Sequence, residues 1–377
     1  MENKSKYHRY QRQILLKEFG VVAQEKLLKA KVLVIGAGGL GCPTLQYLAA
    51  AGVGTIGIVD FDVVEISNLQ RQILFSVEDI GKPKAKVAAE KLKAFNPEIL
   101  IQTFNTKLQG DNALKIISDY DVVIDGSDNF PTRYLVSDAC VLLNKPLVYG
   151  SVFRFEGQVS VFNFGEDKAR TNYRDMFPVT PSPDEVQDCN EAGVIGTLPG
   201  IIGTMQANET IKIITGIGKA LSNKLLTYGA LENSFYEVEV FPREKSNLHL
   251  PKSKEEFLST NYEWLCNRDA AEVKEISTEE FERMLDENNI LVIDVRNDGE
   301  LPELIDISHL KIPLHRLKEN IPLIEEHMKV VVFCQSGIRS VKAAGLIFEA
   351  TQHENIFNLK GGIIAWKKHQ DRNMVPA

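Results

Sequence analysis

The chain has 377 residues, 44% hydrophobic and 25% charged, so it is long enough to form two globular domains with sizeable cores. Its net charge of −8, without a long block of like charges, argues against nucleic acid or an anionic membrane as the main partner. The five cysteines are scattered and include no C-x-x-C pair. This usage argues against a disulfide framework and favours a reducing, cytoplasmic setting.

The N-terminal part alternates strand and helix patterns. Residues 32–59 carry no charged side chain, but their seven glycines break them into strand, glycine loop, helix and strand rather than a membrane span. An amphipathic helix is predicted within 81–97, a third strand at 99–106 and a fourth at 121–129. The continuous apolar strands predict an α/β fold with a parallel sheet covered on both faces.

The next segments change character. Two strands of a partly antiparallel section are predicted at 147–153 and 157–164, followed by a long polar loop over 165–190. A helix containing 205–216 follows the glycine-dotted stretch 192–203. We predict a first domain over 1–245, a polar linker over 246–272 and a second strand–helix domain over 273–377.

A glycine-rich turn opens the first candidate site. Gly36-x-Gly38-x-x-Gly41 follows a strand and starts a helix, so its backbone amides can approach a phosphate. Asp60 lies at the end of the next strand, where a carboxylate can accept hydrogen bonds from ribose hydroxyls. Taken alone, this pattern predicts nucleotide binding and is also compatible with an NAD-dependent dehydrogenase.

Later residues favour ATP over a dinucleotide. Asp60-Phe-Asp62 leads into Ser67-Asn-Leu-Gln-Arg71-Gln, then into a Gly-Lys-Pro-Lys84 motif, and a Ser-Asp128-Asn129 motif follows farther along. These residues offer cations for a triphosphate, an acid for Mg²⁺ and polar groups for a sugar. Hydride transfer needs no such cations at a γ-phosphate, so a nucleotidyl transfer is the better prediction.

At this point the sequence resembles the MoeB/ThiF/HesA family, bacterial relatives of ubiquitin-activating enzymes, over roughly residues 5–245. The resemblance rests on motifs in family order: RYQRQ at 9–13, GAGGLG at 36–41, DFD at 60–62, SNLQRQ at 67–72, GKPK at 81–84, SDN at 127–129, EGQVSVF at 156–162 and CNEAGVIG at 189–196. It implies a Rossmann-like adenylation domain in which ATP adenylates the C-terminal Gly-Gly carboxylate of a small ubiquitin-fold carrier.

The resemblance also implies roles for single residues. Gly39 would lie in the phosphate loop, Asp128 would bind Mg²⁺ with Asn129 beside it, and Arg12 would reach the γ-phosphate from a partner subunit of a homodimer. The remaining nucleotide-binding positions that it implies are Gly36, Gly38, Gly41, Asp60, Asp62, Ser67, Asn68, Arg71 and Lys84. Arg71 and Asp128 are the residues expected to act in the adenylation step itself.

The sequence departs from the family at its structural zinc. Many members have two C-x-x-C pairs, which would fall at 171–175 and near 246–250, where this chain has no cysteine. Because tetrahedral zinc needs ligands of this kind, we predict no zinc site and expect the 165–190 loop to be poorly anchored until a carrier tail binds. Cys189 lies at the end of this loop, and either a covalent link to the carrier or an ordinary thiol fits it.

A second candidate site lies around Cys334, between a predicted strand and helix. The loop amides, the helix N-terminus and Arg339 would each favour a thiolate there, and Gly337 would allow the tight turn. The predicted cradle for a persulfide is Gln335, Ser336, Gly337, Ile338, Arg339 and Ser340. The remaining cysteines have ordinary interpretations: Cys42 and Cys140 in helices of the core, and Cys266 in the linker.

The spacing C-x-x-G-x-R-S at 334–340 resembles the active loop of the rhodanese family. Residues 293–296 (IDVR) and 360–366 (KGGIIAW) also match that family, which implies a small α/β rhodanese domain over 273–377. The segment 297–307 is reshaped relative to the family, which affects the expected recognition of a donor or partner. Persulfide on Cys334 would come from a donor such as a cysteine desulfurase.

Together, the two resemblances predict a two-step activity. Carrier acyl-adenylate made in the first domain would be attacked by the Cys334 persulfide, which displaces AMP and leaves a carrier thiocarboxylate. Molybdopterin synthesis is the favoured pathway, with a thiamine-thiazole or tRNA-thiolation carrier as alternatives. A dehydrogenase with a passenger domain and a non-catalytic carrier-binding scaffold are the competing functions.

Overall fold

The computed structural model describes residues 7–166, 170–178, 193–243, 250–260, 262, 273–285, 290–304, 307–321, 329–351, 353 and 355–373. The chain divides into two compact units, Met1–Tyr262 and Glu263–Ala377. None of the helices in these described ranges is long and apolar enough to cross a membrane.

The first unit is built on a mixed sheet of order β3-β2-β1-β4-β5-β6-β7-β8. The first five strands in the chain are parallel, and the last three run antiparallel to their neighbours. The strands are β1 (Lys31–Ile35), β2 (Thr55–Val59), β3 (Leu100–Phe104), β4 (Val122–Asp125), β5 (Leu147–Phe153), β6 (Glu156–Phe162), β7 (Lys224–Gly229) and β8 (Ser234–Glu239). This arrangement confirms the predicted parallel sheet with an antiparallel extension.

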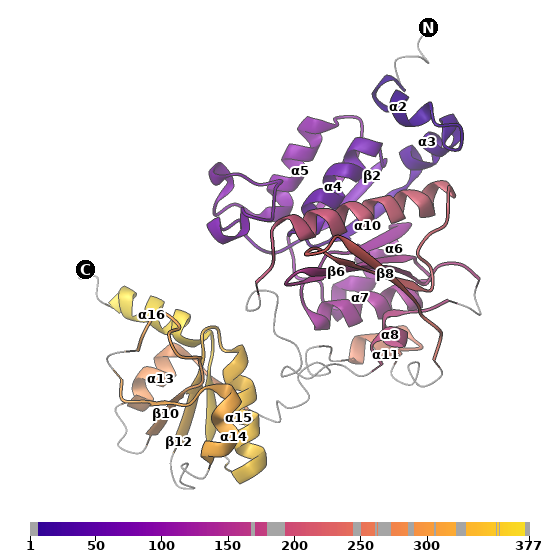
Figure 1. Cartoon of the computed structure of the whole chain (residues 1–377). Coiled ribbons are helices and arrows are strands. Elements are labelled where there is room, and N and C mark those ends of the chain that lie inside the picture. Colours follow the sequence, from indigo (N-terminus) through magenta and orange to yellow (C-terminus); the bar gives the residue numbers. More distant parts are fainter. Residues whose placement is uncertain are drawn as a thin grey trace. The chain divides into compact units, whose positions relative to one another are not determined.

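Helices cover both faces of this sheet. On one face, α4 contacts α5 and α10, and on the other α6 packs against α7 (Figure 1). The helices are α2 (Gln11–Ile14), α3 (Gly20–Lys29), α4 (Gly41–Ala51), α5 (Lys84–Phe95), α6 (Gly110–Ser118), α7 (Phe130–Leu142), α8 (Tyr173–Met176), α10 (Thr197–Thr215) and α11 (Lys254–Ser259), with 3₁₀ turns η1 (His8–Tyr10), η2 (Ile66–Asn68) and η3 (Val77–Asp79). The charge-free segment 32–59 forms β1, α4 and β2, all largely buried.

Helix α10 begins earlier than the sequence pattern predicted. It includes Pro199, Gly200 and Gly203 of the glycine-dotted stretch that was expected to precede the helix. Pro199 lies in the first turn, where a missing N–H costs no helical hydrogen bond. Gly203 lets α10 approach α4 closely, because a Cβ there would lie 2.3 Å from the Leu40 carbonyl oxygen. The glycine therefore serves helix packing and does not break the helix.

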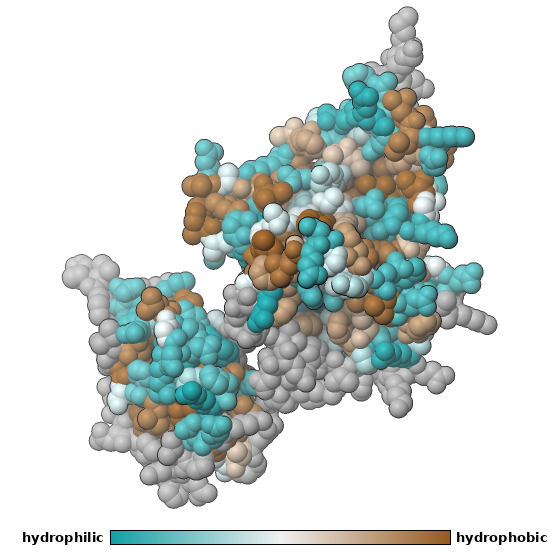
Figure 2. All heavy atoms as spheres, viewed as in Figure 1, coloured by the Kyte–Doolittle hydropathy of each residue, from teal (hydrophilic) through white to brown (hydrophobic). Residues whose placement is uncertain are grey.

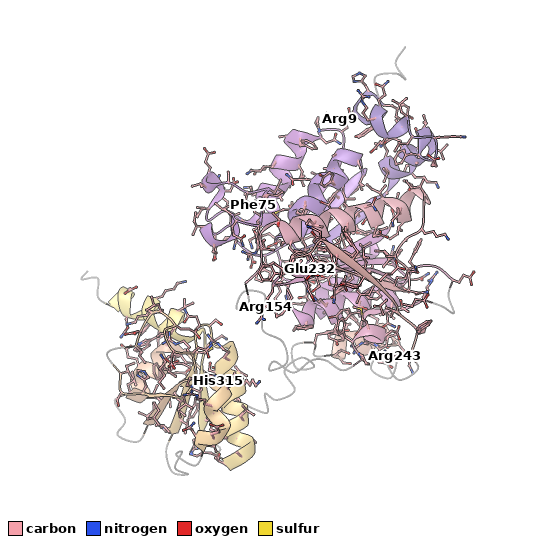
Figure 3. The ribbon with its side chains drawn as sticks, in the orientation of Figure 1. Arg9, Phe75, Arg154, Glu232, Arg243 and His315 are labelled. Carbon is pink, nitrogen blue, oxygen red and sulfur yellow. The ribbon has the colours of Figure 1, made fainter. Side chains whose placement is uncertain are left out.

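The expectation of a poorly anchored loop is wrong for residues 170–178. Arg174 is buried on α8 and makes two hydrogen bonds to the Asp138 carboxylate on α7, at 2.8 and 2.7 Å. Asp175 accepts a hydrogen bond from the backbone N–H of Arg243, which Figure 3 places near α8. A buried ion pair and a hydrogen bond from the Arg243 backbone thus anchor the segment where members of the family were expected to hold zinc. Residues 179–190 lie outside the described residues.

Part of the predicted linker belongs to the first unit. Helix α11 contacts α6 and α7, and its Phe257 has no exposed surface. The Tyr262 hydroxyl donates a hydrogen bond to Asp138, so the buried Arg174–Asp138 pair also holds the end of this segment. The overall polar composition of 246–272 concealed that Phe257 and Tyr262 attach this segment to the first unit.

The second unit is a smaller α/β layer structure. Its sheet has the order β11-β10-β12-β13-β9, and every described strand pair is parallel. The strands are β9 (Lys274–Ile276), β10 (Ile290–Asp294), β11 (Leu310–Lys311), β12 (Lys329–Phe333) and β13 (Ile356–Leu359). Helices α13 (Thr278–Leu285) and α16 (Gly362–Asn373) contact each other, as do α14 (Leu317–Asn320) and α15 (Ile338–Thr351), with strands between the two pairs in Figure 1.

Candidate active sites

A cavity of about 150 Å³ lies at the carboxyl ends of the parallel strands in the first unit. Its lining includes the residues that follow β1, β2, β3 and β4, and β1 and β4 lie side by side at the point where the strand order reverses. Open parallel sheets bind ligands at this position, because the loops on either side diverge there. The predicted residues in the lining are Gly36, Gly38, Gly39, Asp60, Asp62, Arg71, Lys84, Asp128 and Asn129.

The glycine loop is held by close backbone contacts. Gly36 has a φ of +91°, and a Cβ there would lie 2.8 Å from the Gly126 carbonyl oxygen. Gly41, the first residue of α4, packs so tightly that a Cβ would lie 2.0 Å from the Gly36 carbonyl oxygen. Gly41 is not part of the cavity lining, so its role is to shape the loop that leaves Gly38 and Gly39 facing the cavity.

Asp60 ties the end of β2 to the glycine loop. One carboxylate oxygen accepts the Ala37 N–H at 2.8 Å, and the other accepts the Asp62 N–H at 2.8 Å. Burial raises the pKa of the Asp60 carboxyl, and these two amides partly oppose that shift. A carboxylate oxygen has lone pairs for more than one donor, so Asp60 can still accept a hydroxyl hydrogen bond from a sugar.

The two predicted cations in the cavity lining, Lys84 and Arg71, each have a local partner. Lys84 is almost fully buried at the start of α5 and forms an ion pair with Asp62 at 3.0 Å. Arg71 donates a hydrogen bond to the Ser67 carbonyl oxygen at 3.1 Å. Both cations could turn to a phosphate, because Asp62 is half-exposed and the Ser67 carbonyl is a neutral acceptor.

The remaining predicted ligands divide into two groups: three lie outside the cavity lining, and two lie within it. The Asn68 side chain accepts the Glu65 N–H and closes the η2 turn, and Ser67 is exposed beside it. Arg12 is exposed on α2 and is not part of the lining of its own chain's cavity. Asn129 lines the cavity but also caps α7, accepting the Thr132 N–H, and it donates weakly to Asp128 at 3.5 Å. Asp128 itself is exposed within the lining.

The structure adds two cations to the lining that the sequence did not indicate, Lys107 and Arg133. Arg133 on α7 is buried and lines the cavity, where it donates to the Tyr149 and Ser151 hydroxyls at 3.2 and 2.9 Å. Its Nε and the Gln72 Oε1 are buried without a hydrogen-bond partner among the described residues. A single arginine within the mostly apolar helix sequence FPTRYLVSDACVL was the available signal.

The Cys334 loop joins β12 to α15 in the second unit. Cys334 has no exposed surface, the Gly337 N–H points to its Sγ at 3.2 Å, and the Ser340 hydroxyl lies 3.4 Å from the same sulfur. Gly337 has a φ of +95°, which allows the turn that aims this amide inward. Two donors at one sulfur, next to a helix N-terminus, suit a thiolate or the terminal sulfur of a persulfide.

Further contacts fix the sides of the loop. Gln335 donates to the Leu301 carbonyl oxygen at 2.8 Å and accepts from the buried Arg296 at 3.2 Å. The Ser340 hydroxyl lies 2.6 Å from Asn358 Oδ1 on β13. Ser336 is exposed, and the Ile338 side chain lies outside the described residues. Arg296 lies in a family motif that the sequence showed, but nothing in the sequence indicated that Asn358 contacts the loop through Ser340.

Arg339 differs from its predicted role as an uncompensated charge beside the thiol. Its guanidinium forms a bidentate ion pair with Glu300, with both hydrogen bonds at 2.6 Å. This pairing lowers the pKa of the Glu300 carboxyl. Glu300 lies in the segment 297–307 that the sequence marked as reshaped, so its partner could not be read from the motif.

The other cysteines fit the ordinary interpretation where they are described. Cys42 on α4 and Cys140 on α7 are fully buried, as expected for packed helices. Burial raises the pKa of the Cys42 thiol to about 12 and also raises that of Cys140. These thiols are therefore unreactive. Cys189 and Cys266 lie outside the described residues.

Both units match known families. Residues 10–250 match the ThiF family, and residues 277–369 match the rhodanese-like domain. The "Probable adenylyltransferase/sulfurtransferase MoeZ" of Mycobacterium tuberculosis is 42% identical over 97% of this chain and 94% of its own length. A "Probable molybdopterin-synthase adenylyltransferase" of Porphyra purpurea is 40% identical over 96% of this chain and 92% of its own length.

Other relatives match the first unit alone. The "Sulfur carrier protein adenylyltransferase" of Thermus thermophilus is 50% identical over 63% of this chain and 88% of its own length. The crystal structure of E. coli MccB with ATP has a TM-score of 0.55 at 24% identity, covering 63% of this chain and 73% of that chain, and shares the fold. The full-length matches to two-domain enzymes decide the assignment: the chain belongs to the ThiF family and is an adenylyltransferase that carries a rhodanese-like sulfurtransferase domain in the same polypeptide.

Proposed function

We propose that this enzyme adenylates the C-terminal Gly-Gly carboxylate of a small ubiquitin-fold sulfur carrier and then converts it to a thiocarboxylate with sulfur from Cys334. The proposal is carried by two features of one chain. The first is a cavity lined by a glycine loop and cations, and the second is a buried cysteine with hydrogen-bond donors at its sulfur. The name of the Porphyra purpurea relative favours molybdopterin synthesis as the pathway. Because the second step needs a reduced thiol, the enzyme would work in the cytoplasm.

In the first step, ATP is the substrate of the cavity in the first unit. The carrier carboxylate attacks the α-phosphorus, which forms the acyl-adenylate and releases pyrophosphate. Arg71 and Lys84 would leave their local partners to bind the phosphates, and Asp60 would hold the ribose. Cations placed at the phosphates stabilise the charge that grows on the leaving pyrophosphate.

Mg²⁺ would help neutralise the triphosphate, with Asp128 as its protein ligand. The donor set fits, because Mg²⁺ is commonly held by one or two carboxylates together with phosphate oxygens and water. Asp128 is exposed within the cavity lining, so its carboxylate is available to a metal ion from that side.

In the second step, the terminal sulfur of the Cys334 persulfide attacks the acyl carbon and displaces AMP. The acyl disulfide that forms is then cleaved by a thiolate, which attacks the Cys334 sulfur and releases the carrier thiocarboxylate. Cys334 is left in a disulfide with the attacking thiol, and a second thiol restores it. The Gly337 N–H and the Ser340 hydroxyl would hold the anionic sulfur before attack.

We further propose a homodimer in which Arg12 completes the partner's cavity. Arg12 is exposed on α2, so it is available to a second copy. The segment between β2 and α5 also exposes large apolar residues, which gather on one lobe of the first unit in Figure 2. These residues are Phe61, Val63, Ile66, Ile73, Val77 and Ile80. An exposed apolar patch of this kind supports a protein contact.

The test is carrier-dependent exchange of radiolabelled pyrophosphate into ATP, with a panel of Gly-Gly-ended carriers. Exchange with a molybdopterin-type carrier is expected to be fastest, and Arg71→Ala should lower it by about 100-fold or more. Cys334→Ala should keep the exchange and lose thiocarboxylate formation, detected by mass spectrometry of the carrier. Mass spectrometry of the wild-type enzyme should find one added sulfur on Cys334.

Each competing function predicts another outcome. Failure of exchange with every carrier would contradict the proposal. Exchange with only a thiamine-thiazole or tRNA-thiolation carrier would keep the chemistry and change the pathway. A dehydrogenase would instead bind a nicotinamide nucleotide. A scaffold would bind the carrier equally well after Arg71→Ala, with no turnover to lose.

A further inference from the structure

The Cys334 loop is bordered by a segment that supplies a carboxylate to its arginine. Residues 297–304 lie between β10 and β11, and the two oxygens of Glu300 accept one hydrogen bond each from the two Nη atoms of Arg339. The pair is mostly buried, with 27% of the Glu300 side chain and 17% of the Arg339 side chain exposed. Glu300 Oε1 also accepts the Asn297 N–H at 2.8 Å, which fixes the carboxylate within its own segment.

A second arginine at the loop is compensated in the same way. Arg296 contacts Gln335, and its guanidinium pairs with Asp294 at 2.8 Å, both side chains being 1% exposed. In the described part of the second unit, the arginine within the loop and the arginine that contacts it are thus both held by carboxylates. The sulfur keeps its neutral donors, the Gly337 N–H and the Ser340 hydroxyl.

This balance of charge bears on which sulfur donor the site accepts. A small inorganic dianion such as thiosulfate gains much of its binding energy from a cation that is not already neutralised. A persulfide on a protein cysteine carries a single negative charge on sulfur, and its binding energy comes largely from the rest of the protein surface. Two neutral donors at Cys334 suffice to receive one sulfur atom.

We propose that Glu300 determines donor specificity: by neutralising Arg339, it excludes inorganic dianionic donors and reserves Cys334 for persulfide sulfur carried on another protein. This rests on the proposed sulfur transfer and adds the residue that selects between donors. With a protein donor, the Cys334 thiolate attacks the outer sulfur of the donor's persulfide, the S–S bond breaks, and the donor leaves as a thiolate. With thiosulfate, the same attack would release sulfite, and the persulfide could be passed to cyanide as thiocyanate.

The experiment compares two donors in the full-length enzyme. Thiosulfate:cyanide sulfurtransfer gives kcat/KM for the inorganic donor, and a cysteine desulfurase charged with L-cysteine gives the rate for a protein persulfide. Glu300→Gln keeps an oxygen for the Asn297 N–H but frees the charge of Arg339 from its carboxylate. It should raise kcat/KM for thiosulfate by roughly tenfold and change the desulfurase-supported rate by less than about twofold.

Two further variants isolate the ion pair. Glu303→Gln removes the same charge from an exposed position of the same segment, so it should leave both rates within about twofold of wild type. The double variant Glu300→Gln/Arg339→Gln should return the thiosulfate rate to the wild-type level, because the gain depends on the arginine. A thiosulfate gain in Glu303→Gln equal to that in Glu300→Gln, or one that survives loss of Arg339, would overturn the proposal.

A second measurement does not depend on turnover or on the proposed function. The ratio of Cys334 alkylation rates with iodoacetate, an anion, and iodoacetamide, which is neutral, reports the potential at the sulfur. Mass spectrometry of the Cys334 peptide should show that the iodoacetate-to-iodoacetamide rate ratio rises several-fold in Glu300→Gln, because the unpaired charge of Arg339 attracts the anion. An unchanged ratio in a folded variant, judged by circular dichroism, would refute the electrostatic role of Glu300 even if sulfur transfer is confirmed. A raised ratio with no persulfide on Cys334 would instead locate the failure in the sulfur-transfer step.

Discussion

At the scale of single residues, the cavity of the first unit depends on two glycine positions where no side chain fits. Gly36 combines a left-handed backbone with a contact to the Gly126 carbonyl, and Gly41 lies against Gly36 in turn. These two glycines set the path of the loop, so that the amides near Gly38 and Gly39 line the cavity. The requirement is one of space and backbone geometry, and not of chemistry at the glycine itself.

We predict opposite effects for alanine at two glycines of the first unit. Gly36→Ala should destabilise the fold by about 1–3 kcal/mol and abolish pyrophosphate exchange, because the methyl group meets a carbonyl oxygen at a strained φ. Gly200→Ala on α10 meets nothing within 4 Å and should stabilise the fold by about 0.5–1 kcal/mol. Urea unfolding and exchange assays on both variants check this, and equal stability of the two would contradict it.

At the scale of elements, α7 and α8 are joined by a buried charge pair. Arg174 and Asp138 have almost no exposed surface, and Tyr262 adds a third hydrogen bond after α11. The pair fixes a segment that the sequence, without zinc cysteines, suggested was loose. Loss of either partner of a buried ion pair lowers the free energy of unfolding, because the remaining partner becomes an uncompensated buried charge.

Arg174→Met should therefore be strongly destabilising. We expect a loss of about 3–5 kcal/mol in the free energy of unfolding, because Asp138 is left buried without its cation. Lys224→Met breaks the exposed pair with Glu237 and serves as the matched control, with little change expected in the urea midpoint. A similar small effect from both substitutions would show that the α7–α8 junction does not depend on the ion pair.

The segment 297–304 should respond to acid through Glu300. Its carboxyl pKa is lowered from 4.5 by the Arg339 hydrogen bonds, so the pair stabilises the segment above that pH and is lost as the pH falls through the lowered value. Deuterium uptake of this segment, corrected for intrinsic rates, should rise between about pH 5.5 and about pH 3.5 in wild type. Glu300→Gln should show raised uptake at both values, with a smaller change between them.

The sequence predicted most of the strands, the glycine loop and the position of Cys334, because periodicity and glycine spacing are local signals. It could not reveal Glu300 as the partner of Arg339, since the two residues are 39 positions apart and the pairing depends on how two loops meet. Arg133 was missed for a similar reason: two of its partners lie on β5, and a charged residue on a helix ordinarily faces solvent. The early start of α10 was concealed because glycines ordinarily disfavour a helix, whereas Gly203 here allows close packing against the start of α4.

At the scale of the whole molecule, two units with separate cores carry two chemistries. The first unit has its cavity at the parallel strand ends, and the second has its thiol at the end of β12. Each site is built from residues of its own unit, so a defect in one should leave the other intact. The relatives that match the first unit alone agree with this independence.

The proposed dimer can be tested by mixing two inactive variants. If Arg12 serves the partner's cavity, Arg12→Ala and Arg71→Ala should each lose pyrophosphate exchange. An equimolar mixture, denatured and refolded together, should recover about a quarter of the wild-type rate, because half of the dimers are mixed and half of their sites are intact. No recovery, with refolded wild type active, would contradict a shared cavity.

The buried position of Cys334 also affects how fast the enzyme is inactivated by oxidation. Peroxide oxidises cysteines in proportion to their thiolate character and exposure, and oxidation beyond the sulfenic acid is essentially irreversible. Cys334 has no exposed surface, so peroxide has little access to its sulfur in the unloaded protein. In the proposed persulfide the outer sulfur lies beyond the Cys334 sulfur, so oxidation of that outer atom would spare the cysteine itself.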